Sequence, residues 1–523
     1  MTASSDRSKG HSRSSPSGGD RPPEGAVEDG EVGRAAKFGF EGWLVSKPRA
    51  RRFSSRHSVP HHVAEWLLSR FRGKVNSGSE AARRARELLS ERLAEAEDIE
   101  LLKMEASTEG SVQVIDEVAG EFDEHLGEPV LAFSELGLKN VPVDKETAKN
   151  HPRLLKGGFY ANVQLSYVGE SDSGSPFRAA NLRPLAPSGT DLLERLSAGR
   201  KHFSDAAWLY FLVRSVGLAA PSERIGPRTA ALAVLRLVPL VQKQYSLLEL
   251  GPRGTGKSYL YENLTPHAYV LQSGTASKAQ LFVHAGTGEA GLVAEYDAVC
   301  FDEVTTTSAG IGDIVSSLKG YLSSGASRRG KEEVRGRASV VFIGNIDRPV
   351  GEVLGESGHL FAPLPEALSE DTAVMDRISA YVPGWEMPKL GPKYYASGLA
   401  LPSDVLAECL KEVRGRNYTP EIQHRLILKG NLTGRDRQAV WQTIGGLLKL
   451  IYPSPDGISP ENVSDEVLRW AAWLGLEMRL RVRSQQHRLQ PDEFEEGEFG
   501  FRMEDDNRIT PIRLREEKAR PGP

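Results

Sequence analysis

The stretch LLELGPRGTGKSYLYENLTP, from Leu247 to Pro266, decides the fold. It opens with apolar residues, passes through a glycine-rich segment and ends in a helical pattern, so it predicts a strand, a turn and a helix in that order. The turn satisfies the pattern G-x-x-x-x-G-K-[ST] between Gly251 and Ser258. Glycines allow successive backbone N–H groups to converge on an anion, and the positive end of the following helix points at the same place. The stretch is therefore predicted to bind phosphate groups.

Each residue type in this loop has a physical task in holding a nucleoside triphosphate. Lys257 can reach the β- and γ-phosphates, and the Ser258 hydroxyl can ligate Mg²⁺. We therefore expect ATP and Mg²⁺ as cofactors. The competing interpretation is a chance match in a glycine-bearing turn, which the flanking strand and helix patterns weaken. The predicted nucleotide-binding residues of the loop are Gly251, Gly254, Thr255, Gly256, Lys257 and Ser258.

Two further strands are expected to end in polar residues beside this loop. Ala298 to Phe301 predict a buried strand, and Asp302 and Glu303 follow it directly. Ligands bind at the carboxyl ends of strands in an open α/β sheet, so we expect Asp302 to hold Mg²⁺ and Glu303 to act as general base on the attacking water. The strand SVVFIGN ends in Asn345, which is expected to orient that water, the role called sensor 1. The alternatives are an ordinary strand end and a turn asparagine.

Two arginines further along the chain are candidates for contact with the nucleotide. Arg377, in TAVMDRISAYVPGW, follows the sensor strand where a subunit boundary would lie. It could stabilise charge on a neighbour's γ-phosphate as an arginine finger, and the alternative is a surface salt bridge. Arg435 or Arg437, in a helical lid, could touch the nucleotide as sensor 2, and we prefer Arg435. The predicted catalytic residues are Glu303, Asn345, Arg377 and Arg435.

Two local clusters of basic residues favour contact with the phosphate backbone of duplex DNA. The net charge of −4 gives no global nucleic-acid signature, so a basic surface must be local. One cluster is the arm SKPRARRFSSRH, which could also be a solvated linker. The other is a predicted hairpin, SGASRRGKEEVRGR, which would point at the pore of a ring or form a subunit contact. The candidate DNA contacts are Arg51, Arg52, Arg328, Arg329 and Lys331.

Composition changes along the chain predict its domain organisation. The N-terminal residues are rich in Ser, Gly and Pro, which is typical of disorder. No apolar run approaches the roughly 18 residues of a membrane span, and no signal-peptide pattern is present, so a cytoplasmic protein without membrane contact is expected. The predicted segments are a disordered tail (1–35), a basic arm and helical domain (36–108), a β-rich, possibly OB-like domain (109–190), an α/β core (191–395), a helical lid (396–485) and a polar tail (486–523).

Several motifs together resemble a known family. They are ELGPRGTGKSYLYENLTP, CFDEV, SGASRRGKEE, VVFIGN, HLFAPLPEAL, DRISAYVPGWEMPK and NLTGRDRQAVWQTIGGLLKLIYP. Over residues 60–485 the chain resembles the BrxL family, Lon-related AAA+ proteins of bacterial BREX phage-defence systems. The resemblance implies an α/β AAA+ P-loop ATPase core of MCM-like type with a helical lid, assembly as a hexamer or double hexamer, DNA binding, other BREX proteins as partners and a role in restricting phage.

One departure from the family pattern affects the expected activity. Many members carry a C-terminal Lon-type protease-like domain, and the residues after position 485 are too few to form one. We therefore expect ATP hydrolysis and no peptidase activity. The expected function is a DNA-engaging AAA+ ATPase of phage defence. The alternatives are a protein-remodelling ATPase that lacks its own peptidase site, and an assembly in which nucleotide controls ring formation.

Overall fold

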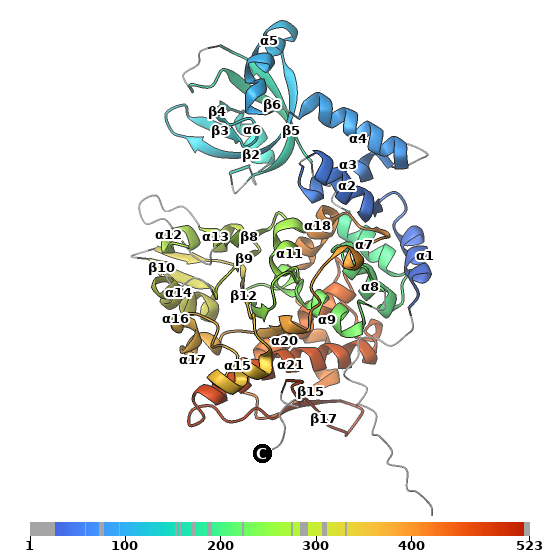
Figure 1. Ribbon diagram of the computed structural model, residues 1–523, viewed down its shortest axis with the longest axis vertical. Coiled ribbons are helices and arrows are strands. Elements are labelled where there is room, and N and C mark those ends of the chain that lie inside the picture. Colours follow the sequence, from blue (N-terminus) through green and yellow to red (C-terminus); the bar gives the residue numbers. More distant parts are fainter. Residues whose placement is uncertain are drawn as a thin grey trace, which may run out of the picture.

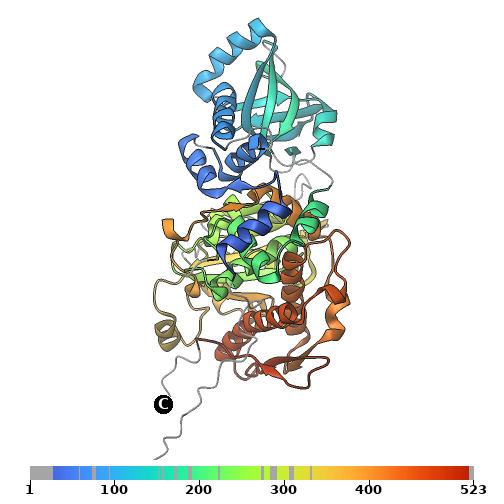
Figure 2. The same ribbon diagram turned by 90° about the vertical axis from the view of Figure 1, so that its right-hand side faces the viewer.

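The computed structural model arranges the chain as three parts along its long axis. Most of a helical and β-rich N-terminal part lies at the top of Figure 1, an α/β core in the middle and most of a C-terminal part at the bottom, and the side view agrees (Figure 2). The structure describes residues 27–516, except 58, 73–77, 94, 152–153, 156–157, 170–172, 186–190, 222–223, 273–275, 283–290, 306–310 and 330–331.

The core is built on a parallel sheet of five strands. Its strand order is β13-β7-β12-β9-β8. The strand β7, which leads into the glycine-rich loop, therefore lies between β12 and β13, the last two strands of this sheet along the chain. All residues of β7 and β9 are buried, which explains their apolar runs. The predicted α/β AAA+ core is confirmed. The strands are β7 (Ser246–Gly251), β8 (Ala268–Leu271), β9 (Ala298–Phe301), β12 (Ser339–Asn345) and β13 (Ala380–Pro383).

Helices cover the sheet, and a hairpin extends from one side of it. The hairpin pairs β10 (Ala326–Arg329) with β11 (Glu332–Arg335) in antiparallel register, as the sequence predicted. The helices of the core are α7 (Leu192–Arg200), α8 (Asp205–Ser215), α9 (Pro227–Leu235), α10 (Val238–Val241), α11 (Lys257–Asn263), α12 (Lys278–Leu281), α13 (Leu292–Glu295), α14 (Ile311–Ser324), α15 (Val350–Ser357), α16 (Glu366–Ser369) and α17 (Thr372–Met375).

The C-terminal part combines helices with a small antiparallel sheet of β15, β16 and β17. Phe499, Phe501 and Met503 of β16 are buried, so the chain is ordered through residue 516 and the prediction of a polar tail from residue 486 is wrong for this range. These apolar residues alternate along the chain, which is a strand pattern. The acidic segment directly before them led to the prediction of a polar tail. The elements are α18 (Ser403–Val413), α19 (Thr419–Ile422), β15 (Leu426–Gly430), α20 (Gly434–Ile451), α21 (Asp465–Leu489), β16 (Phe499–Met503) and β17 (Thr510–Pro511).

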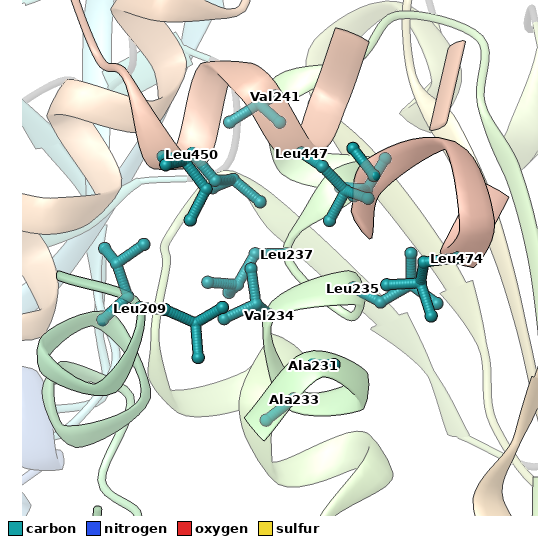
Figure 3. Packing of buried hydrophobic residues seen from close by; sticks show 14 of the residues in the cluster. Leu209, Ala231, Ala233, Val234, Leu235, Leu237, Val241, Leu447, Leu450 and Leu474 are labelled. Atoms are coloured by element: carbon teal, nitrogen blue, oxygen red, sulfur yellow. The ribbon is translucent and has the colours of Figure 1, made fainter. Parts of the chain in front are cut away.

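Helices of the core and of the C-terminal part share one hydrophobic core. Figure 3 shows Leu209 of α8 and Val234 of α9 near Leu450 of α20. Leu447 of α20 and Leu474 of α21 belong to the same cluster and are fully buried. Apolar residues at helical spacing on each of these helices supply this contact. The C-terminal helices are therefore packed firmly against the core.

The N-terminal part begins earlier than composition suggests. Helix α1 (Asp29–Gly39) buries Val32 and Ala36, so the predicted disordered tail of residues 1–35 is wrong for its last residues. Residues 1–26 fall outside the part of the chain that the structure describes. The strand β1 pairs with β14 of the core, which ties the two parts together. The remaining elements are β1 (Val45–Ser46), α2 (Lys47–His57), α3 (His61–Arg72), α4 (Gly78–Arg92), α5 (Ile99–Glu109) and β14 (Leu399–Ala400).

A barrel-like sheet forms the far end of the N-terminal part (Figure 1). Its strand order is β4-β3-β2-β5-β6, and a parallel bridge between Val143 and Ala179 joins the two edges. A short helix lies between the third and fourth strands. Five strands connected in this way have the topology of an OB barrel. The elements are β2 (Val112–Asp123), β3 (Glu128–Phe133), β4 (Leu138–Pro142), α6 (Lys145–Asn150), β5 (Phe159–Tyr167) and β6 (Phe177–Pro184).

Candidate nucleotide-binding site

Three strand ends meet at the carboxyl edge of the parallel sheet. In the register of β12 and β7, Asn345 lies opposite Gly251. In the register of β12 and β9, Phe342 lies opposite Phe301, the last residue before Asp302. The structure therefore brings together the glycine-rich loop, the acidic pair and the sensor asparagine, as the sequence predicted. Because their roles depend on a bound nucleotide, those roles stay predictions.

The glycines of the loop are required by its geometry. Gly254 and Gly256 have φ values of 80° and 74°, in the left-handed region that favours glycine. A Cβ atom on Gly251 would lie 2.3 Å from the carbonyl carbon of Gly384, just after β13. A Cβ on Gly256 would lie 2.6 Å from Cδ1 of Leu390. Gly251 is thus required by the close approach of the Gly384 backbone, and Gly254 and Gly256 by their positive φ, and the loop forms a cradle of the kind that fits phosphate oxygens.

Lys257 is placed where the loop and the sensor strand meet. Its Nζ atom donates to the carbonyl oxygens of Gly251 and Pro252 at 2.9 and 2.8 Å and to Oδ1 of Asn345 at 3.3 Å. Burial lowers the pKa of Lys257, Glu249 opposes this shift and Arg236 adds to it. The ammonium group lies at the strand ends, where it could contact the terminal phosphates.

The acidic pair is held by a strained turn after β9. Glu303 has a φ of 55°, which is unusual for a residue with a side chain, and its N–H donates to Oδ1 of Asp302 at 2.8 Å. Two contacts tie this turn to the sensor strand, because Val304 N–H donates to the carbonyl of Ile343 at 3.0 Å and Thr305 Oγ1 accepts from Asn345 N–H at 3.1 Å. Such strain is typical of functional positions. It fixes the Glu303 backbone relative to Asn345.

The residues at this edge also fit a magnesium ion. Ser258 is the second residue of α11, and Asp302 follows β9, which is separated from β7 by β12. A hydroxyl and a carboxylate are the oxygen ligands that Mg²⁺ prefers when phosphate oxygens and water complete its shell. Ser258 and Asp302 would hold the ion, which would neutralise charge on the phosphates.

A buried ion pair beside the loop is not evident from the motif. Arg236, which follows α9, donates through Nε to Oε2 of Glu249 at 2.9 Å and through Nη1 to the carbonyl of Thr255 at 3.1 Å. The two side chains are 3% and 1% exposed. The pair therefore connects β7 to the loop. Its sequence signal is Glu249 itself, because a carboxylate inside a buried apolar strand requires a partner.

Arg377 lies at the opposite edge of the sheet from its own glycine-rich loop. It precedes β13 by three residues, and its carbonyl accepts a hydrogen bond from the hydroxyl of Ser246, the first residue of β7. The six residues of β7 separate this end from the loop by about 20 Å. The arginine is therefore placed away from the phosphates that its own chain would bind.

The structure places Arg435 beside Arg377 and not beside the loop of its own chain. Arg435, at the start of α20, pairs with Asp376. Arg479 of α21 contacts the same carboxylate at 3.0 Å. Burial would raise the pKa of Asp376, but the charges of Arg479 and Arg435 bring it below its ordinary value. Arg437 is exposed on the same first turns of α20. The sensor 2 prediction therefore holds only if the phosphates belong to another subunit.

The basic N-terminal segment is a docked helix and not a free arm, which corrects the prediction. Lys47 of α2 is buried and pairs with Glu65 of α3 at 2.7 Å. The guanidinium of Arg51 lies 4.3 Å from the ring centroid of Tyr395. Arg52 is exposed, and its Nε donates to the carbonyl of Pro48 at 3.4 Å. Of the two candidate DNA contacts in this helix, Arg52 is therefore the exposed one, and Arg49 and Arg56 are exposed beside it.

The hairpin residues stay candidates for DNA contact. The backbones of Arg328 and Arg329 belong to β10, where they lie opposite Glu333 and Glu332. Lys331 is not among the residues described by the structure. No helix within the described chain is both long and apolar enough to span a membrane.

Two family models match successive parts of the chain. Residues 177–500 match the family model described as "Lon-like protease BrxL-like, ATPase domain", and residues 39–167 match "BREX system Lon protease-like protein BrxL N-terminal". A structure of a full-length MCM homolog from Methanopyrus kandleri aligns with a TM-score of 0.38 at 13% identity, covering 84% of this chain and 100% of the other.

Two curated relatives align over most of the chain. The "Lon-like protease BrxL" of Bacillus cereus (strain H3081.97) is 34% identical over 466 residues, which cover 88% of this chain and 68% of the relative. The protein of the same name from Escherichia coli O9:H4 (strain HS) is 34% identical over 465 residues, which cover 88% of this chain and 65% of the relative. Together with the two family models, this identity shows that the chain belongs to the BrxL family of Lon-like proteins of BREX systems.

Proposed function

We propose that this protein is an ATP hydrolase that assembles as a ring, a hexamer or double hexamer, and couples hydrolysis to action on duplex DNA in phage defence. One observation carries the proposal. The groups suited to binding phosphates lie at the carboxyl edge of the sheet, and the two candidate arginines lie at the amino edge. A complete site therefore requires two subunits, each of which contributes one edge.

The arginines at the amino edge support this arrangement. Nε of Arg377 is buried and has no hydrogen-bond partner within the described residues, and its Nη1 donates only to the nearby carbonyl of Ala373. Arg435 is 52% exposed although it pairs with Asp376. Both guanidinium groups could turn toward phosphates offered by a neighbour, where they would stabilise charge that develops in the transition state.

Within one subunit, the residues of the carboxyl edge would divide the chemistry. Lys257 would bind the terminal phosphates, and Asn345, already 3.3 Å from Lys257 Nζ, would orient the attacking water. Glu303 would accept the proton of that water. Ser258 and Asp302 would hold Mg²⁺, which supplies positive charge beside the phosphates.

DNA engagement and BREX partners are supported by fold and family. The barrel in the N-terminal part has a topology that often binds nucleic acid, and the β10–β11 hairpin carries basic residues near the core. Membership of the BrxL family supports a place among other BREX proteins. The names of the two curated relatives include the word protease, and that word describes those two proteins.

ATP turnover with different polymers tests the proposal. Duplex DNA should increase turnover by the wild-type ring, and an unfolded polypeptide should not. An Arg377→Ala variant should assemble and bind nucleotide normally but lose turnover by roughly 10³-fold or more, the effect of removing an arginine finger. Stimulation by unfolded protein alone would favour protein remodelling, and normal turnover by the variant would contradict a shared site.

A further inference from the structure

A cavity of about 560 Å³ opens directly beside the glycine-rich loop. The loop contributes Gly254 and Gly256 to its wall, and α11 contributes Tyr259. On the other side lie Leu390 and Tyr395, which follow β13. Its volume lies within the range of small-molecule pockets in proteins. Since it adjoins the phosphate cradle, a ligand held by its phosphates at the loop would extend into this space.

The wall that follows β13 is fixed to the loop and to the core by backbone hydrogen bonds. Leu390 N–H donates to the carbonyl of Gly254 at 2.7 Å. Tyr395 forms an antiparallel bridge with Leu218, and the N–H of Ala396 donates to the carbonyl of Gly217 at 2.8 Å. The backbone at Tyr395 is therefore fixed relative to the phosphate cradle.

The remaining wall comes from helix α2 of the N-terminal part. One face of this helix carries Lys47, Arg51, Ser54 and Ser55. Arg51 is four residues after Lys47, and the two serines are three and four residues after Arg51, which is the spacing of a helix face. Arg51, Ser54 and Ser55 line the cavity. Lys47 anchors the face, because it pairs with Glu65 at 2.7 Å, and Glu65 in turn accepts from Ser403 N–H of α18 at 2.7 Å.

The charge and shape of this space suit a nucleoside. Arg51 lies over the face of Tyr395, 4.3 Å from the ring centroid, and Tyr395 and Tyr259 are 36% and 48% exposed. Flat guanidinium and aromatic groups are the partners on which nucleobases stack. The hydroxyl oxygens of Ser54 and Ser55, whose protons go to backbone carbonyls, and the amide oxygen of Asn263 can accept hydrogen bonds from ribose or base edges.

We propose that this cavity is the nucleoside subsite, that it binds the base and ribose of the triphosphate, and that α2 of the N-terminal part is its outer wall. The base stacks against the pair that Arg51 and Tyr395 form where the N-terminal part meets the core. The inference rests on the proposed ATP hydrolase function. By thermodynamic reciprocity, nucleotide in the subsite stabilises the docked position of α2, and docking of α2 strengthens nucleotide binding.

Titration of the full chain with ADP and with inorganic pyrophosphate tests the subsite. Tyr395→Ala and Arg51→Ala should each weaken ADP binding by roughly tenfold, the effect of losing one stacking partner, and should leave pyrophosphate binding unchanged. Arg52→Ala, on the solvent face of the same helix, is the matched control and should bind ADP like the wild type. Equal weakening of both ligands, or no weakening of ADP binding, would overturn the subsite.

Hydrogen exchange of the wild-type chain gives a test that needs no substitution. ADP should slow amide exchange over residues 47–57 of α2, and pyrophosphate should not. Slowing by both ligands, or by neither, would overturn the role of α2 as a wall. A chain that binds ADP as expected but never hydrolyses ATP would overturn the proposed function and leave the subsite standing.

Discussion

At the scale of single residues, the candidate site separates binding from chemistry. Lys257 contacts the loop carbonyls and Asn345, whereas Glu303 belongs to a strained turn at the end of β9. Positive charge on Lys257 would act on the phosphates in every state of the reaction. The carboxylate of Glu303 would act only when water attacks. Substitutions at the two positions should therefore have different consequences.

Lys257→Ala and Glu303→Gln test this separation. The first should abolish nucleotide binding, because the terminal phosphates lose their cation. The second should bind nucleotide normally and lower turnover by about 10²-fold to 10⁴-fold, the contribution of a positioned general base. Nucleotide affinity and turnover should be measured for both variants. Wild-type turnover in the Glu303 variant would show that another group activates the water.

A buried carboxyl in α18 predicts a dependence of stability on pH. Burial raises the pKa of Asp404 from 3.8 to about 8. The hydrogen bond from the Val405 N–H lowers this pKa, and the negative charge of Glu65 raises it further. Lys47 and Glu65, from α2 and α3, are the charged groups that act on it. The folded state binds this proton more tightly than the unfolded chain does. The stabilisation is thus complete below about pH 4 and is lost as pH rises toward about 8.

Asp404→Asn removes this titration. The melting temperature of the variant relative to the wild type should therefore rise as the pH increases from about 5 to about 8. Thermal unfolding at several pH values measures the difference, and Asp465→Asn, at an exposed helix start, serves as control. A difference that does not change with pH would show that Asp404 is ionised in the folded protein.

At the scale of elements, the parts that could be predicted from the sequence are those that local patterns encode. The strands before Gly251, Asp302 and Asn345 are buried apolar runs, and parallel strands must present their carboxyl ends together, so the site edge followed from the sequence. The position of Arg435 beside Asp376 could not be predicted in this way. A helix start carries no local signal of which sheet edge it will approach, since that depends on how α20 packs against the core.

The docking of α2 was equally invisible in the sequence. Its many arginines are typical of a solvated or DNA-binding segment, but its inward face is defined by Lys47, whose partner Glu65 lies in the next helix. A buried ion pair between two helices leaves no periodic signal. The same holds for the cavity, because its walls come from α2, α11 and the segment after β13.

The ion pair of Arg236 and Glu249 predicts how an element supports the loop. Arg236→Met should destabilise the protein by about 3–5 kcal/mol, because it leaves a carboxylate buried without its partner. The double variant Arg236→Met/Glu249→Met should recover most of this loss, because neither charge remains. Denaturant unfolding of the two single variants and the double variant measures the coupling. A double variant as unstable as the sum of the single variants would contradict the assignment.

At the scale of the whole molecule, the carboxyl edge of the sheet carries the glycine-rich loop and the amino edge carries Arg377 and Arg435. DNA contact by the hairpin makes a separate prediction. If about six phosphate contacts form, log K should fall with log salt at a slope of about −5. The triple variant Arg328→Ala/Arg329→Ala/Lys331→Ala should reduce the magnitude of this slope by up to about 2.7, the contribution of three contacts. The reduction should be similar on unrelated duplexes, because contacts with the phosphate backbone do not read sequence.

Binding at several salt concentrations on two duplexes measures this effect. The matched control removes three exposed cations of the C-terminal part, Lys411, Arg416 and Arg508, and should keep the wild-type slope. An unchanged slope in the hairpin variant would indicate a subunit contact in place of a DNA contact. A loss confined to one duplex would indicate base readout.

The central claim, a nucleotide site shared by two subunits, is tested most directly by mixing two inactive variants. Arg377→Ala subunits keep the loop, and Lys257→Ala subunits keep the arginine, so intact sites form only where the two meet. Turnover should reappear on mixing and peak near equal amounts, where about a quarter of interfaces are intact. If assembly is normal and no mixing ratio restores turnover, Arg377 does not act on a neighbouring subunit and the account is contradicted.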